Sequence, residues 1–97
     1  MTRYMLLYTG PATSPAASHD TWPEWFRNAG DRLVDVGSPL IGGLAVRSDQ
    51  SMADPASRVN GYSIVEAEDI TTAMALLGDH PYLAQGEAFT IEVHALR

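Results

Sequence analysis

The chain has no cysteine, few basic residues and no long apolar run, and each absence excludes a class of protein. Without cysteine there are no disulfide bonds, no catalytic thiolate and no cysteine zinc site. Six basic residues against twelve acidic ones give a net charge of −6 and form no cluster that could neutralise a row of phosphates. No run approaches the ~20 apolar residues of a membrane span. We therefore expect neither a nucleic-acid partner nor a membrane partner.

Signals of several catalytic classes are also missing. The sequence has no Gly-rich phosphate loop and no G-x-S-x-G serine elbow, so phosphoryl transfer and acyl transfer have no support. The three histidines, His19, His80 and His94, lack the close spacing that marks a shared metal ion. The opening residues lack the long apolar core of a signal peptide. We expect a cytoplasmic protein that uses no metal and no cofactor.

What is present is the composition of one small globular domain over residues 1–97. Hydrophobic residues make up 45% of the chain and charged residues 19%, which is typical of a packed protein rather than a disordered one. A chain of this size buries only about two thirds of the surface that its unfolded form exposes. Association with further copies is therefore an obvious source of stability.

Hydrophobic periodicity predicts four strands and two helices. Strands are expected at 3–9, 40–46, 61–67 and 87–96, with polar loops at 10–20 and 47–60. The first strand is apolar on both faces. A first helix should begin at the capping box that Thr21 forms with Glu24 and end at Gly37. A second helix should be capped by Asp69 and end at Gly78. Its buried stripe is expected to consist of Ile70, Ala73, Met74 and Leu77.

The resulting order, β-α-β-β-α-β, predicts an α+β domain with a ferredoxin-like antiparallel sheet and both helices on one face. The other face of the sheet is left without cover, although the first strand, expected in the middle of the sheet, is apolar on both sides. We expect this face to be buried against a second copy of the chain in a symmetric homodimer.

Several segments resemble the YCII-related (DGPF-domain) family of small bacterial proteins. They are the opening "RYMLLY", the tryptophan-containing start of the first helix, "NGYSIVEAEDITTAMAL" and "DHPYLAQGEAFTIEVHAL", which together span nearly the whole chain. The resemblance implies a dimeric α+β barrel, with a pocket in each subunit between sheet and helices. Activity in the family is mostly unassigned. Some relatives are suspected enzymes with a His and Asp pair, similar in fold to muconolactone isomerase and to cofactor-independent monooxygenases.

The chain differs from those relatives where their acid and base stand. Residues 25–28 of the first helix contain no histidine, and the nearest one, His19, precedes the helix. Their acid stands immediately before the proline that follows the second helix, whereas this chain has His80 at that position and Asp79 one residue earlier. The "DGPF" stretch is absent, and only Asp54-Pro55 occupies the comparable loop.

Each candidate residue has a functional and a structural interpretation. His80 could move a proton near pH 7 beside a pocket, or it could simply complete a helix C-terminus. The candidate catalytic residues are His80, Asp79 and Asp54, and the candidate substrate-binding residues are Tyr8, His19, Trp22, Trp25 and Tyr82. Asp79 could equally be a solvated acid and Asp54 a turn residue before Pro55. His19 could belong to a polar loop that leads into the helix cap, and the tryptophans could be core or interface residues.

Three functional hypotheses stay open on this basis. The first is a small-molecule enzyme with cofactor-independent acid/base chemistry, in which a pocket holds a small ring-shaped or aromatic substrate. The second is a non-catalytic ligand-binding or accessory module that uses the same dimer. The third is a purely structural dimer without a pocket. The sequence does not choose among them.

Overall fold

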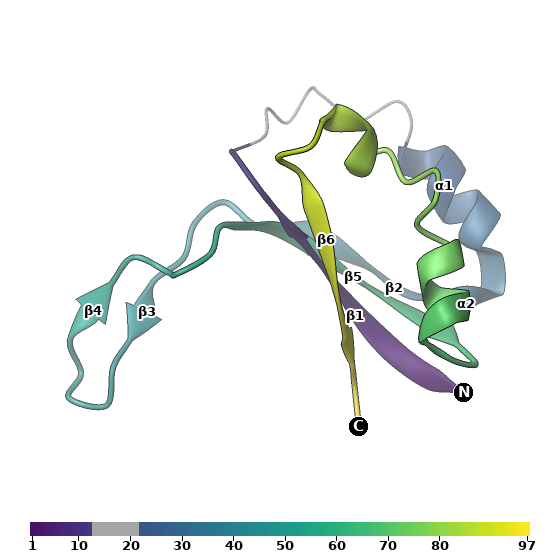
Figure 1. Ribbon diagram of the computed structural model, residues 1–97. Helices are drawn as coiled ribbons and strands as arrows, with labels where there is room; N and C mark the ends of the chain where they lie inside the picture. Colours follow the sequence, from purple (N-terminus) through teal and green to yellow (C-terminus); the bar gives the residue numbers. More distant parts are fainter. Residues whose placement is uncertain (13–21) are drawn as a thin grey trace.

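The sheet of this protein is antiparallel and carries both helices on one face. The computed structural model describes residues 1–12 and 22–97. The sheet strands are β1 (Thr2–Thr9), β2 (Leu33–Pro39), β5 (Val59–Ala67) and β6 (Thr90–Ala95), in the spatial order β2-β5-β1-β6. The helices are α1 (Trp22–Ala29) and α2 (Ile70–Ala75), with 3₁₀ turns at Gly30–Arg32 and Leu83–Gln85. Figure 1 shows α1 and α2 on the same side of the sheet. The predicted α+β class is confirmed, and the arrangement is compatible with a ferredoxin-like fold.

Strand β1 occupies the expected central position, between β5 and β6. Successive side chains of a strand point to opposite faces, so Tyr4, Leu6 and Tyr8 face the helices and are buried. Met5 and Leu7 point to the other face and are half-buried. The core therefore lies between β1, β5 and the two helices, and the opposite face of the sheet has no helix over it.

The first helix is shorter than predicted. The second strand begins within the residues that were predicted to form the end of this helix. Gly30 adopts a left-handed backbone (φ 56°) directly after Ala29, so the helix ends there and not at Gly37. Strand β2 follows at Leu33–Pro39. Of the strand predicted at 40–46, only Ala45–Val46 is extended, and it lies outside the four-stranded sheet. Gly37 (φ 80°) instead lies in an irregular part of β2, where a Cβ would collide with the Tyr62 carbonyl oxygen.

Both helices bury a narrow stripe. In α1, Trp25 and Ala29 are buried, while the expected cap residue Thr21 lies outside the described residues. In α2, the predicted cap is confirmed, because the Asp69 side chain accepts a hydrogen bond from the Thr72 backbone N–H at 2.8 Å. Its predicted stripe is wrong in part, because the side chains of Ile70 and Met74 are exposed. This short helix presents only Ala73 to the sheet, and Leu77 follows it into the core.

Residues 40–58 form a separate hairpin, here called the hairpin arm. Strands β3 (Ala45–Val46) and β4 (Met52–Ala53) pair antiparallel within it, where the sequence predicted the end of a strand and a long loop. No residue from 40 to 58 is buried. Figure 1 shows the hairpin arm extending from one end of β2 and β5, on the side of the sheet away from the helices. The radius of gyration, 14.3 Å, exceeds the ~13 Å of a compact chain of 100 residues.

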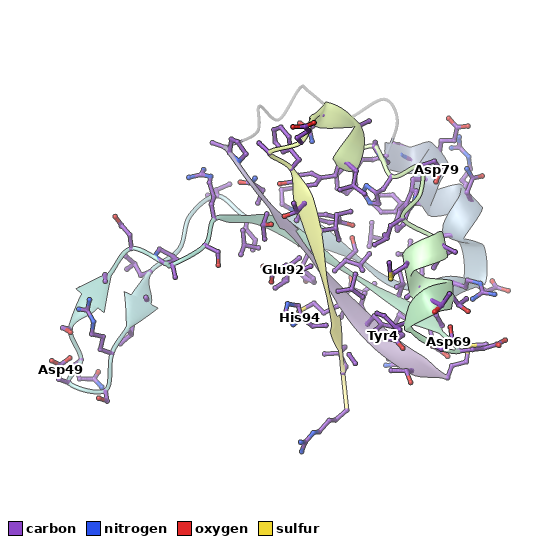
Figure 2. The ribbon with its side chains drawn as sticks, viewed as in Figure 1. Tyr4, Asp49, Asp69, Asp79, Glu92 and His94 are labelled. Carbon is purple, nitrogen blue, oxygen red and sulfur yellow. The ribbon has the colours of Figure 1, made fainter. Side chains whose placement is uncertain are left out.

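The sheet surface turned away from the helices is here called the open face. Its centre is apolar and half-buried, because Leu7 lies opposite Tyr62 and Met5 lies opposite Ile64. Charged groups flank this centre: Arg3 pairs with Glu66 at 3.8 Å, and His94 lies 2.8 Å from Glu92. Figure 2 shows Glu92 and His94 pointing away from the helices, while Tyr4 points toward them. Within the described ranges, no helix has the length and apolar character that crossing a bilayer requires.

Candidate functional site

His80 is a core residue, with only 1% of its surface exposed. The chain leaves α2 through a turn in which the His80 backbone N–H donates to the Leu77 carbonyl at 3.1 Å. Pro81 follows and cannot continue a helix. The next turn, at Leu83–Gln85, sends the chain back toward β6. His80 is thus held under this connection, facing the sheet and α1.

Both ring nitrogens of His80 have a partner. Nδ1 accepts a hydrogen bond from the Tyr82 backbone N–H at 3.0 Å, and Nε2 lies 3.2 Å from the Tyr8 hydroxyl. A backbone N–H can only donate, so Nδ1 carries no proton, and in the neutral ring the proton sits on Nε2. His80 therefore donates to the Tyr8 oxygen.

The Tyr8 hydroxyl extends this pair into a chain. It donates to Ser63 Oγ at 2.7 Å, and Ser63 Oγ donates to the Val36 carbonyl at 2.8 Å. Every bond in the series points the same way, from the Tyr82 amide to the Val36 carbonyl on β2. We call this series the His80 hydrogen-bond chain. It joins β1, β2, β5 and the connection after α2, and it satisfies three buried polar side chains.

Burial keeps the two titratable groups of this chain uncharged near pH 7. It lowers the pKa of His80 from its ordinary 6.5 to about 4. It raises the pKa of Tyr8 from 10.0 to about 12, even though the hydrogen bond to Ser63 lowers it. The imidazole of His80 is therefore neutral at physiological pH. Its Nε2–H can donate a hydrogen bond, but the ring is not an imidazolium cation that could release a proton.

Aromatic rings enclose His80. The ring centroids of Trp25, Trp22 and Tyr8 lie 4.2, 4.8 and 5.1 Å from that of His80. Tyr82 lies 5.2 Å from Tyr8, and its hydroxyl accepts a hydrogen bond from Asn60 Nδ2 at 2.9 Å. We call Tyr8, Trp22, Trp25, His80 and Tyr82 the His80 cluster. These are five of the residues proposed from the sequence, and the fold brings them together from β1, α1 and the segment after α2.

The two tryptophans of the cluster use their indole N–H groups differently. Trp25 Nε1 donates to the Leu76 carbonyl at 2.8 Å, just past the C-terminus of α2, and so ties the two helices together. Trp22 Nε1 is buried and has no hydrogen-bond acceptor among the residues that the structure describes. It is a second N–H donor next to the His80 ring.

The remaining candidate residues do not join the cluster. Asp79 is exposed, and none of the hydrogen bonds described for His80 involves it; Figure 2 shows it on the helix side of the molecule. Asp54 is exposed on the hairpin arm, directly after β4. His19 lies outside the described residues. In the described ranges, no three histidine or acidic side chains are grouped as a metal ion would need.

Ser63, which links Tyr8 to β2, is a member of the site that was not predicted from the sequence. A signal for it exists, because Ser63 alternates with Gly61, Val65 and Ala67, all of which are buried on the helix side of β5. A serine in such a row needs a hydrogen-bond partner.

The chain matches no protein-family model, no curated protein and no solved structure. Its resemblance to the YCII-related family therefore stays a prediction from the sequence.

Proposed function

We propose that this chain is a homodimeric small-molecule enzyme of the YCII-related type, with a ferredoxin-like fold whose two sheets close into a dimeric α+β barrel. The apolar centre of the open face supports the dimer, because Met5, Leu7, Tyr62 and Ile64 are large side chains that no helix covers. The cytoplasm is the expected compartment, from the sequence alone.

The proposed chemistry is cofactor-independent acid/base catalysis on a small ring-shaped or aromatic substrate that carries a carbonyl group. One observation carries this proposal: His80 is a buried neutral imidazole whose Nε2–H is fixed as a donor by the Tyr82 amide at Nδ1. A neutral imidazole in this form can polarise a carbonyl oxygen as charge develops on it, which triosephosphate isomerase illustrates. His80 thus supplies the acid half of the chemistry.

The substrate oxygen would take the place of Tyr8 as the acceptor of the His80 Nε2–H. That contact, at 3.2 Å, is the longest in the His80 hydrogen-bond chain and so the easiest to exchange. The buried N–H of Trp22 would be a second donor for the same oxygen. The flat rings of Trp22 and Tyr82 would contact the ring of the substrate. Asp54 or Asp79 remains the proposed assisting carboxylate, and His19 the proposed contact from the segment before α1.

A second candidate function, a non-catalytic ligand-binding or accessory dimeric module, is favoured by one observation. Each buried polar group of His80, Tyr8 and Ser63 already has its partner within the chain. A network this complete stabilises a core without any ligand. Under this hypothesis His80 is a structural residue, and ligand or partner binding uses surfaces outside the cluster.

Screening the protein against a library of small aromatic acids and lactones distinguishes the enzyme from the non-catalytic module. We expect NMR titration to shift the His80 ring nitrogens, and mass spectrometry to detect a converted product that the His80→Gln variant does not form. His94→Gln is the matched control, because His94 lies on the opposite face of the sheet from the His80 cluster. Binding without conversion, unchanged in His80→Gln, would support the second candidate. Binding of no compound at the His80 cluster would contradict the enzyme.

A further inference from the structure

The hairpin arm exposes several large apolar side chains. Ile41 is fully exposed, and Leu44, Val46 and Met52 are each more than 60% exposed. Val46 lies directly opposite Met52 in the β3–β4 pair, so both point to the same side, whereas the partly buried Ala45 and Ala53 point to the other. Val46 and Met52 therefore form an apolar pair on one side of the β3–β4 ladder, and the described part of the chain leaves both largely exposed.

The hairpin arm has little to hold it in shape by itself. Its ladder consists of only two residue pairs, and isolated two-stranded hairpins are marginally stable in water. Local side-chain bonds at its tip, such as Ser51 Oγ donating to Asp49 at 2.6 Å, fix the turn and not the ladder. A surface that packs against Val46 and Met52 would supply the stabilising contacts that this short ladder does not provide.

The position and charge of the hairpin arm indicate which surface packs against Val46 and Met52. The arm extends on the side of the sheet away from the helices, which is the side of the open face (Figure 1). Its two arginines, Arg47 and Arg58, balance its two aspartates, Asp49 and Asp54, so the rest of the chain carries the whole net charge of −6. A neutral apolar arm can approach a second acidic copy without the repulsion that the remaining surface would meet.

We propose that the hairpin arm packs against a second copy of this chain, so that in the homodimer each subunit holds the other with its arm. This inference rests on the proposed homodimer and extends its interface beyond the open face. The centre of the open face offers only four large apolar residues, bordered by charged pairs. Two arms, related by the two-fold axis, would add Ile41, Leu44, Val46 and Met52 from each subunit.

Matched methionine substitutions test this arm. Met52 on the hairpin arm and Met74 on α2 have similar exposure, 65% and 60%, but lie on opposite sides of the sheet. In sedimentation equilibrium we expect a Val46→Thr, Met52→Gln variant to raise the dimer dissociation constant about tenfold or more, since each change counts in both subunits. Met74→Gln should leave that constant unchanged.

The outcomes separate the arm from the dimer itself. A wild-type dimer whose dissociation constant is the same in the arm variant and in Met74→Gln would overturn the arm contact and leave the homodimer standing. A monomeric wild type would overturn the homodimer first and the arm with it. Should the arm variant not fold, filtered NOEs in a dimer of labelled and unlabelled wild-type subunits decide the question. We expect the Val46 and Met52 methyl groups to show contacts between subunits, and a dimer without them contradicts the inference.

Discussion

On the helix-covered face of the sheet, His80, Tyr8 and Ser63 are buried and satisfy one another, whereas on the open face Met5 and Leu7 have only their strand neighbours. The first region contains polar groups in the core, yet each has a partner inside the chain. The second contains apolar groups that contact solvent. Apolar surface left in water costs free energy in proportion to its area. The side chains of β1 are therefore buried on one face of the sheet and in partial contact with solvent on the other.

Truncation of adjacent residues on β1 should separate the two faces most strongly. Leu6 is fully buried on the helix side, so Leu6→Ala should lower the free energy of unfolding by about 2–5 kcal/mol. Leu7→Ala, the next residue and on the open face, should cost clearly less within one subunit and should instead weaken association. Urea unfolding at several protein concentrations measures both effects. Equal losses in the two variants would show that the faces do not differ in this way.

Acid should weaken the helix-covered face through His80. The pKa of His80 is about 4 in the folded protein, below the ordinary 6.5, so the unfolded chain takes up the proton first as the pH falls. The stability that neutral His80 provides is complete above pH 6.5 and is lost as the pH falls toward 4, about 3 kcal/mol in all. His80→Gln cannot titrate and should lack this part of the pH dependence. Parallel stability curves of the two proteins between pH 4 and 7.5 would contradict the buried neutral ring.

A smaller effect is expected from removing one hydroxyl from the His80 hydrogen-bond chain. Tyr8→Phe leaves the His80 Nε2–H without its acceptor and Ser63 without its donor, at a cost of about 1–3 kcal/mol. Tyr4→Phe is the matched control on the same strand and face, because the Tyr4 hydroxyl makes no hydrogen bond among the described residues. Denaturation at pH 7 should show a loss for Tyr8→Phe alone. The same stability in both variants would mean that the chain of bonds contributes nothing.

The sequence predicted correctly those features that depend on residues close together in the chain. The apolar run around Leu6 predicted β1. Asp69 caps α2 as predicted, because its hydrogen bond to Thr72 spans only three residues. The prediction failed where the same residues fit both the spacing of a helix and that of a strand. Leu33 and Val36 fit the helical spacing after Ala29 as well as they fit a strand, and only the left-handed backbone at Gly30 separates the two.

The candidate site could be predicted in its residues but not in its chemistry. His80 was identified from its position at the end of a helix, yet its partner Tyr8 lies far away in the sequence, as does Ser63, which bonds to Tyr8. Nothing local indicates that these residues meet. The surroundings of Asp79 and Asp54 could not be predicted from the sequence either. Asp79 is the neighbour of His80 along the chain, but the turn after α2 leaves it exposed while it buries His80.

The state of association of the intact chain in solution tests the central claim, that one face of the sheet needs a second copy. We expect sedimentation equilibrium at micromolar concentration to give twice the chain mass of 10.5 kDa, with Leu7→Glu shifting the protein to the monomer, since it adds a charge to the open face next to Glu92. A wild-type protein that sediments at 10.5 kDa under the same conditions, folded and unaffected by Leu7→Glu, would contradict the account.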